Sequence, residues 1–101
     1  MVRPCKERTI CLELKNAYFR PEKFSGQAPD EVVLEVDEIE ALRLADLDGE
    51  YQEDAALKMG ISRATFSNIV KRARQKTAEA VIRGKALRLN CPRFSEKKEL
   101  R

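Results

Sequence analysis

Apolar and polar residues alternate in two segments near the start of the chain. In ERTICLEL the side chains of Ile10, Leu12 and Leu14 fall on one face, and EVVLEV repeats the pattern over residues 31–36. A period of two is typical of β-strands. We therefore predict two short strands that could pair. The segment between them, KNAYFRPEKFSGQAPDE, contains proline and glycine and is predicted to be a loop.

From residue 37 the apolar residues recur at helical spacing. DEIEALRLADL opens with Asp37 and Glu40, whose spacing is that of a capping box, in which side chains satisfy the free amides at a helix start. Asp48-Gly49 is predicted to end this first helix. Its predicted apolar side contains Ile39, Leu42 and Leu44 to Leu47.

Two more helices and a third strand follow. The second helix covers residues 51–59 and ends at Gly60, because the residue after a helix often needs the positive φ that glycine adopts without steric cost. The third begins with Ser62 as its N-cap and runs to Arg83, before Gly84. KALRL alternates again and is predicted to be a strand.

These elements predict a mainly α fold, with a helix-turn-helix three-helix core and a small β element from N-terminal and C-terminal strands. The chain of 101 residues is long enough for one domain. We place that domain at residues 1–89, with strands and a loop over residues 1–36 and the helical core over residues 37–83. Residues 90–101 are predicted to be a basic C-terminal tail.

The residues around Gly60 have the spacing of a helix-turn-helix. Small Ala56 suits the closest approach of two helices, Gly60 suits the tight turn, and Phe66 and Ile69 fill the angle between them. In such motifs the second helix lies in the major groove of DNA. The predicted buried stripe of the third helix is Phe66, Ile69, Val70, Ala73 and Thr77, and the opposite side carries Ala64, Ser67, Asn68, Lys71 and Gln75, with Arg63 at the leading end of the helix.

The chemistry of this opposite side fits base recognition. Arginine can bond two acceptors of guanine, asparagine can pair with adenine, and alanine can pack on the methyl group of thymine. We predict that Arg63, Ala64 and Asn68 read bases, with Thr65 and Ser67 as further candidates. The free amides near Ser62 suit a phosphate. The predicted contacts to the phosphate backbone are Lys71, Arg72, Arg74 and Lys76.

Charge is distributed unevenly along the chain, although the net charge is only +3. Residues 30–54 contain eleven acids and one base, Arg43, whereas residues 61–76 contain no acid. A localised basic segment predicts one face for a polyanion. Charge alone fits a solvated helix face equally well, and it is the combination with the turn spacing that favours nucleic acid.

Composition narrows the possible locations and functional classes of the protein. The chain is 43% hydrophobic and 37% charged, without an apolar run that could cross a bilayer or a secretory signal, so we expect a cytoplasmic protein. It has no histidine, no glycine-rich phosphate loop and no nucleophile with a recognisable base, so we expect no enzyme. The acids near the start of the first helix are explained by its dipole.

The three cysteines, Cys5, Cys11 and Cys91, do not have the spacing of a zinc site, which usually needs four ligands in close pairs. We predict no metal and no cofactor, and interpret the three cysteines as buried or incidental thiols. A zinc site shared across a dimer and a thiol sensor stay open as alternatives.

The order RPCKERTIC, YFRP and then DEIEALRLADLDGEYQEDAALKMGISRATFSNIVKRARQKTAEAVIRGKALRL resembles a family of short bacterial and archaeal proteins, domain-of-unknown-function family 134, over residues 1–89. The resemblance implies DNA binding. The helical part is also similar to region 4 of bacterial sigma factors, which implies DNA recognition by the helix that begins at Ser62. The tail after Asn90 is not part of the family pattern.

Two functions and one assembly are predicted. The first function is sequence-specific binding of double-stranded DNA by a transcriptional regulator. The alternative is a protein–protein interaction module that docks onto the transcription machinery. A homodimer is expected, because helix-turn-helix proteins usually bind as two-fold dimers and the last turns of the third helix are apolar on more than one side. The apolar residues concerned are Ala78, Ala80, Val81 and Ile82. Those that are not needed for packing within the domain core could instead be buried against the first strand.

Overall fold

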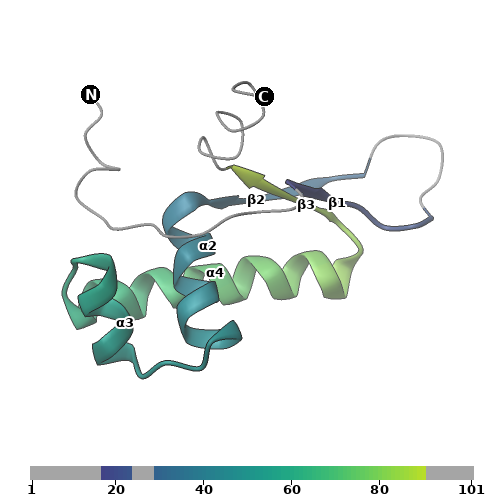
Figure 1. The fold of residues 1–101 in the computed structure, drawn as a ribbon. Helices are drawn as coiled ribbons and strands as arrows, with labels where there is room; N and C mark the ends of the chain where they lie inside the picture. Colours follow the sequence, from purple (N-terminus) through teal and green to yellow (C-terminus); the bar gives the residue numbers. More distant parts are fainter. Residues whose placement is uncertain (1–16, 24–28, 91–101) are drawn as a thin grey trace, which may run out of the picture.

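The structure is a computed structural model that describes residues 17–23 and 29–90 (Figure 1). Over these residues the fold is mainly α with a small three-stranded sheet, as the sequence predicted. The strand predicted over ERTICLEL and the basic tail after Asn90 lie outside the described residues. The elements in chain order are β1 (Tyr18–Phe19), β2 (Glu31–Glu35), α2 (Val36–Leu42), the π-helical turn η1 (Arg43–Leu47), α3 (Gln52–Met59), α4 (Arg63–Arg83) and β3 (Ala86–Asn90).

The sheet has the strand order β1-β3-β2. β2 and β3 are parallel, with Glu31 opposite Ala86 and Glu35 opposite Asn90, and β1 runs antiparallel to β3. The strands predicted over EVVLEV and KALRL are therefore confirmed, and they pair with each other. A parallel pair needs a long crossover, which the helices between β2 and β3 supply. β1 is a two-residue strand within the segment predicted to be a loop.

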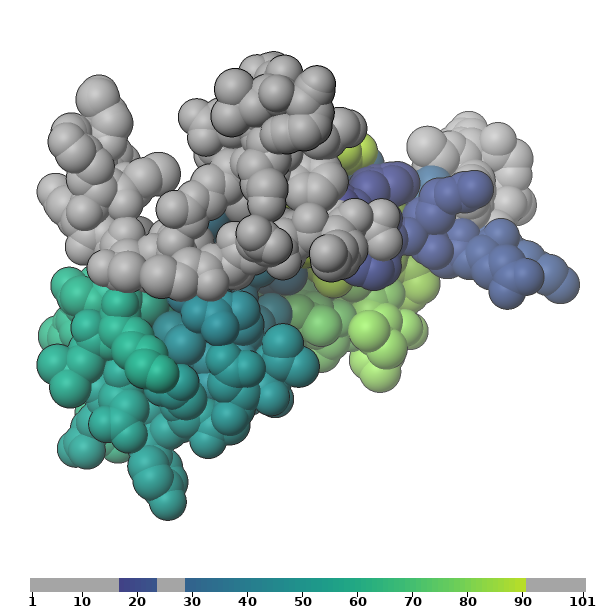
Figure 2. Space-filling model, in the orientation of Figure 1, coloured from purple at the N-terminus to yellow at the C-terminus, as the bar shows by residue number. Residues whose placement is uncertain are grey.

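The sheet lies over α4, and α2 crosses α4 near its middle, with α3 against the N-terminal end of α4 (Figure 1). In Figure 2 the same order appears on the surface, from α3 through α2 to the C-terminal half of α4. One buried cluster joins α2, η1, α3 and α4 around Leu44, Met59 and Phe66. A second joins the sheet to the helices through Leu34, Ile39 and Ala73.

The start of α2 differs from the prediction. The helix begins at Val36 with Glu35 as its N-cap, and the capping box is formed by Glu35 and Glu38 instead of Asp37 and Glu40. The backbone N–H of Glu35 donates to Oε1 of Glu38 over 2.9 Å. The helix starts two residues earlier than the predicted box because β2 leads into it without an intervening loop.

The end of this first helix also differs from the prediction. Leu44 is buried as expected, but Leu47 is 79% exposed. The last turn is π-helical, and the N–H of Asp48 donates to the carbonyl of Arg43, five residues back. Each residue of a π turn rotates the chain about the helix axis by a smaller angle than a residue of an α turn does. Leu47 therefore lies outside the apolar stripe.

The turn between α3 and α4 has the predicted form. Gly60 adopts φ +72°, and its N–H caps the carbonyls of Ala56 and Leu57 at the end of α3. Ser62 is the N-cap of α4, because its hydroxyl oxygen accepts from the N–H of Thr65 over 3.1 Å. The chain therefore breaks between two helices at Gly60. Four of the five residues of the predicted stripe on α4, Phe66, Ile69, Val70 and Ala73, are buried, and Thr77 is half-buried.

Candidate nucleic-acid interface

The outward face of the first half of α4 carries most of the predicted base readers. Ala64, Asn68 and Lys71 are exposed on the side of the helix opposite its buried stripe, and Arg63 is exposed at the leading end of the helix. Within the described residues, no hydrogen bond or ion pair engages the side chains of Arg63, Asn68 or Lys71. The outward face and the leading end of α4 thus present two cations and one amide to solvent, and no described residue competes for them.

The two hydroxyl residues at the front of α4 cap the helix. Ser62 accepts from the N–H of Thr65, and its own hydroxyl donates to Oγ1 of Thr65 over 2.9 Å. The amides of Arg63 and Ala64, in the first turn, have no acceptor within the helix and point toward its N-terminal end. Ser67, the remaining candidate, is half-buried. The front of α4 therefore offers backbone amides and the side chain of Arg63 at one place.

On one flank of α4, Arg72 and Lys76 bind the carboxylate of Glu38 from α2. Nε of Arg72 lies 3.1 Å from Oε2 of Glu38, and Nζ of Lys76 lies 2.9 Å from Oε1. The side chain of Glu38 is only 2% exposed. Burial opposes its ionisation, but hydrogen bonds from the N–H of Glu35 and from both cations outweigh burial and hold the pKa of Glu38 below its ordinary value.

On the other flank, Arg74 forms a bidentate pair with Asp46 of η1. The two nitrogen–oxygen distances are 3.0 Å and 2.8 Å, and both side chains are nearly half exposed. The hydrogen bonds from Arg74 hold the pKa of Asp46 below its ordinary value. η1 directly follows α2, which crosses α4 (Figure 1), and the ion pair shows that η1 lies beside this flank.

The structure thus divides the predicted DNA contacts into two groups. Ala64, Asn68 and Lys71 share the outward face and Arg63 lies at the leading end of α4, whereas the other three basic side chains lie on the flanks and bind acids of the same chain. The acids concerned, Glu38 and Asp46, were not among the predicted site residues. The feature of the sequence that could have indicated these two acids is the acidic run over residues 30–54, to which both belong and from which they pair with the acid-free run on α4. The flank cations are Arg72, Arg74 and Lys76.

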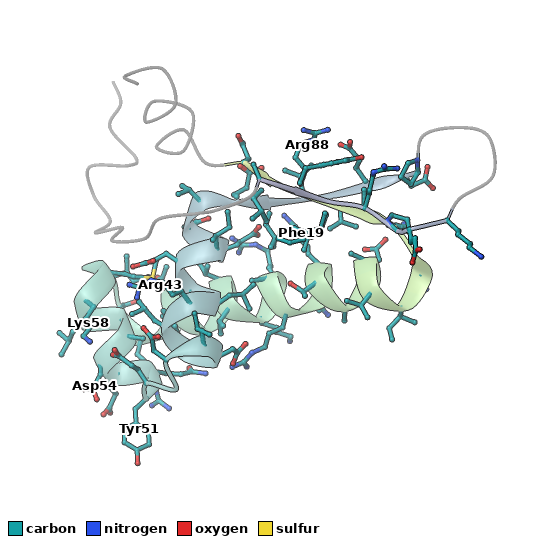
Figure 3. The ribbon with its side chains drawn as sticks, turned by 45° about the vertical axis from the view of Figure 1, so that its right-hand side comes forward. Phe19, Arg43, Tyr51, Asp54, Lys58 and Arg88 are labelled. Atoms are coloured by element: carbon teal, nitrogen blue, oxygen red, sulfur yellow. The ribbon has the colours of Figure 1, made fainter. Side chains whose placement is uncertain are left out.

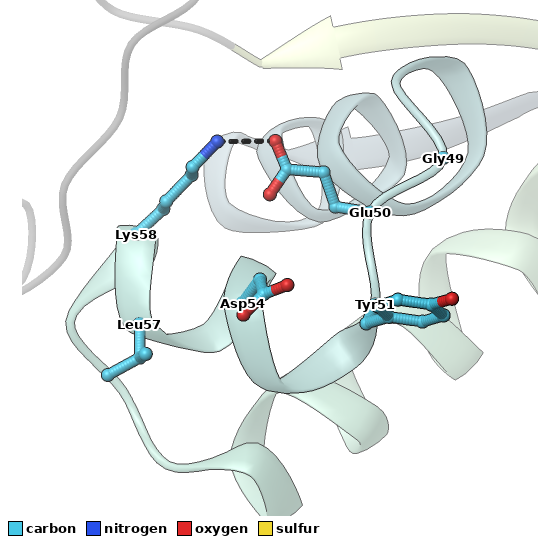
Figure 4. A pocket seen from close by; sticks show the side chains of 6 residues that line it. All are labelled: Gly49, Glu50, Tyr51, Asp54, Leu57 and Lys58. Carbon is cyan, nitrogen blue, oxygen red and sulfur yellow. Dashed lines mark hydrogen bonds and ion pairs between the residues drawn. The ribbon is translucent and has the colours of Figure 1, made fainter.

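A second surface feature lies on α3 and the turn before it. A hollow of about 480 Å³ is lined by Gly49, Glu50, Tyr51, Asp54, Leu57 and Lys58. Figure 4 shows Lys58 paired with Glu50 across it, while Asp54 has no partner among the described residues. Tyr51 is 81% and Leu57 77% exposed, and in Figure 3 the ring of Tyr51 points away from the body of the molecule.

Metal-binding clusters and membrane-spanning helices are both absent from the described ranges. Residues 17–23 and 29–90 contain no group of three acid, cysteine or histidine side chains that could hold a metal ion. In the same part of the chain, no helix is long and apolar enough to cross a bilayer. Cys5, Cys11 and Cys91 lie outside it, so the interpretation of the cysteines stays a prediction.

Comparison with known proteins gives a family. The model of the family described as protein of unknown function DUF134 matches residues 1–96. The chain belongs to this family. It is 46% identical over 99 residues to a UPF0251 protein of Vibrio vulnificus, with 98% of this chain and 97% of the relative covered. A UPF0251 protein of Aeromonas salmonicida is 44% identical over 91 residues, with 90% and 89% covered.

Some relatives in this family are longer than this chain. A UPF0251 protein of Syntrophobacter fumaroxidans is 51% identical over 87 residues, which make up 86% of this chain but 56% of the relative. No solved structure matches the chain. The predicted family is therefore confirmed, but its model extends to residue 96, so the prediction that the tail after Asn90 lies outside the family pattern was wrong for residues 91–96. The printed descriptions of these proteins name no activity or ligand.

Proposed function

We propose that the chain binds double-stranded DNA in a sequence-specific way, through α3, the turn at Gly60 and α4, and acts as a transcriptional regulator. The observation that supports this most is the outward face of α4. Asn68 and Lys71 are exposed there, Arg63 is exposed at the leading end of the same helix, and no described residue competes for them. Such a combination of one bidentate guanine reader, one bidentate adenine reader and one phosphate contact suits a major groove.

The way in which α4 is held supports the same function. α3 crosses its N-terminal end, the αL turn at Gly60 fixes the angle, and the buried side chain of Phe66 locks the contact. A recognition helix needs such support because readout depends on side chains reaching fixed base edges. The similarity to region 4 of sigma factors, noted in the sequence, points to the same helix. We propose that the chain binds as a homodimer, in keeping with two-fold half-sites.

Selection of binding sites from random duplex DNA tests the proposal. We expect an enriched sequence with inverted repeats, bound with an affinity that falls steeply as salt rises. Arg63→Ala and Asn68→Ala should each weaken binding to that sequence by about 1–3 kcal/mol and relax selection at one base pair. Arg83→Ala is the matched control, because Arg83 is also exposed on α4 but lies at the opposite end. If the two first variants bound the selected site as well as the control, base reading by this face would be wrong.

The alternative function is a protein-interaction module, and the hollow on α3 favours it. Exposed Tyr51 and Leu57 beside the carboxylate of Asp54, which pairs with no described residue, suit a partner with basic and apolar side chains. Leu57→Glu separates the two functions. It should leave the selected DNA sequence unchanged if the bases are read by α4. An absence of salt-dependent DNA binding in the unmodified chain would favour the alternative.

A further inference from the structure

An apolar groove runs along one side of α4, beneath the sheet. It consists of two hollows of about 490 Å³ and 360 Å³, and both have Phe19 and Leu87 among their lining residues. The first hollow lies against α2 and η1 and reaches Leu47, and the second continues along α4 to Val81. Figure 3 shows Phe19 on the α4 side of the sheet. We call these two hollows together the apolar groove.

The borders of the apolar groove expose more apolar surface than a folded core explains. Leu47 is 79%, Val81 70% and Phe19 50% exposed. A contiguous exposed apolar patch marks an interaction site more often than scattered apolar side chains do. Ala80, by contrast, is buried. The surplus apolar side chains that the sequence predicted in the last turns of α4 are therefore only partly buried within the chain.

Charges of both signs border the apolar groove. The pair of Arg74 with Asp46 lies at the end near η1, and the pair of Lys85 with Glu79 lies at the end near β3. A surface that pairs with an identical surface must be complementary to itself, and alternating ion pairs around an apolar centre meet that condition. A strongly charged partner would instead favour a border of one sign.

We propose that the apolar groove is the surface on which a second copy of this chain docks, around a two-fold axis near Val81. This inference rests on the proposed function, since it names the surface that pairs the two DNA-binding units. Val81 is rotated by about 140° from Asn68 around the axis of α4, at about 100° per residue. Docking there leaves the outward face of the first half of α4 uncovered.

The length of α4 supports a second copy as the occupant. The candidate base readers centre on residue 65, and the contact of α4 with the groove centres on residues 79–81. At about 1.5 Å per residue the two centres are about 21–24 Å apart, so antiparallel α4 helices would separate the readers by about 42–48 Å along the helix axes. A crossing angle between the two helices shortens this separation toward the spacing of one DNA turn, about 34–36 Å.

The other exposed apolar surface does not give this spacing. Tyr51 and Leu57 lie on α3 or at its start, next to the turn at Gly60 that leads into the readers. A two-fold axis at that surface would place the readers of the two copies well within one DNA turn. Compared with the surface at Tyr51 and Leu57, the groove is therefore the one compatible with adjacent half-sites.

Sedimentation equilibrium of the full chain without DNA tests the docking surface. We expect the unmodified chain to be a dimer of 11.6 kDa subunits. Val81→Glu and Leu47→Glu should each raise the dissociation constant of the dimer about tenfold or more, because each would bury carboxylates at the contact. Leu57→Glu is the matched control, since Leu57 is equally exposed but lies on α3. It should leave the dissociation constant within about twofold of the unmodified chain's.

Two results would overturn the proposal. One is an unmodified chain that stays monomeric at every concentration, in which case other segments of this chain or another protein cover the groove. The other is a dimer that Leu57→Glu weakens and Val81→Glu does not. The result is independent of DNA binding, because Arg63→Ala should lose DNA affinity and remain dimeric. If the chain bound no DNA but formed a dimer that Val81→Glu weakened, the proposed function would be wrong and the docking surface would be supported.

Discussion

The two flanks of α4 neutralise their cations in different ways. On one flank Arg72 and Lys76 converge on Glu38, whose side chain is 2% exposed. On the other flank Arg74 meets Asp46, and both side chains are nearly half exposed. The geometry of the hydrogen bonds is similar, with distances between 2.8 and 3.1 Å. Burial is what differs.

Burial decides what each ion pair contributes. Removing one partner of a buried pair leaves an uncompensated charge and costs about 3–5 kcal/mol, whereas an exposed pair contributes about 0–1 kcal/mol. The pair with Glu38 is therefore a structural tie between α2 and α4. The pair of Arg74 with Asp46 is weak enough for a phosphate to compete for the arginine. A basic residue on a predicted recognition helix can thus bind DNA only to the extent that the acidic residue paired with it is exposed to solvent.

Glu38→Gln tests the buried side of this comparison and has the largest expected effect. We expect a loss of about 2–3 kcal/mol in the free energy of unfolding, less than for a fully buried pair because Arg72 and Lys76 reach solvent. The shift of the urea midpoint measures it. Glu53→Gln, an exposed acid on α3, is the control and should change stability by less than about 0.5 kcal/mol. Equal effects of the two variants would contradict the structural role of Glu38.

The pH dependence of stability gives a second test of the same tie. The pKa of Glu38 is lower in the folded chain than its ordinary value of 4.5, so its contribution is fully present above pH 4.5 and is lost as the pH falls through the folded pKa. We expect the free energy of unfolding to fall on acidification below about pH 4.5. Glu38→Gln should make that fall shallower than in the unmodified chain. Urea titrations at a series of pH values would measure it, and parallel curves for the two proteins would rule out Glu38 as a cause.

The sequence predicted the region around Gly60 because local chemistry determines it. A glycine that needs positive φ, a serine N-cap and a stripe such as Phe66, Ile69 and Val70 act within a few residues of one another. Pattern alone therefore located the turn and both helices. The same holds for the strand over EVVLEV, whose alternation reflects one buried face.

The features that the sequence did not predict depend on distant residues. The parallel pairing of β2 with β3 joins residues more than fifty positions apart. The tie of Glu38 to Lys76 spans 38 positions, and that of Asp46 to Arg74 spans 28. A pattern of charges shows that acids and bases are segregated, but only the packing of α2 on α4 shows which acid meets which base. The π turn at η1 likewise depends on a hydrogen bond that no periodicity encodes.

Lys71→Ala and Lys76→Ala sharpen the comparison on the DNA side. Lys71 has no partner among the described residues, whereas Lys76 is held by Glu38 and the carbonyl of Val33. If the proposed function holds, Lys71→Ala should reduce the slope of log affinity against log salt by about 0.9 per chain. Lys76→Ala should lower the stability of the fold and leave that slope nearly unchanged. Fluorescence anisotropy with a labelled duplex at several salt concentrations measures both, and an equal loss of slope would mean that buried pairing does not withhold a cation from DNA.

Asp46→Asn tests the exposed flank and has the smallest expected effect on the fold. We expect at most about 1 kcal/mol in the free energy of unfolding, because the pair with Arg74 is exposed and its partner stays solvated. Its effect on DNA binding should have the opposite sign to that of Lys71→Ala. Release of Arg74 adds one cation beside the outward face, so the salt slope should rise by up to about 0.9 and affinity for unselected duplexes should increase. In Asp46→Asn with Arg74→Ala the slope should equal that of Arg74→Ala alone, since Asp46 acts on DNA only through Arg74; a slope steeper than that of Arg74→Ala would show that the acid repels DNA directly.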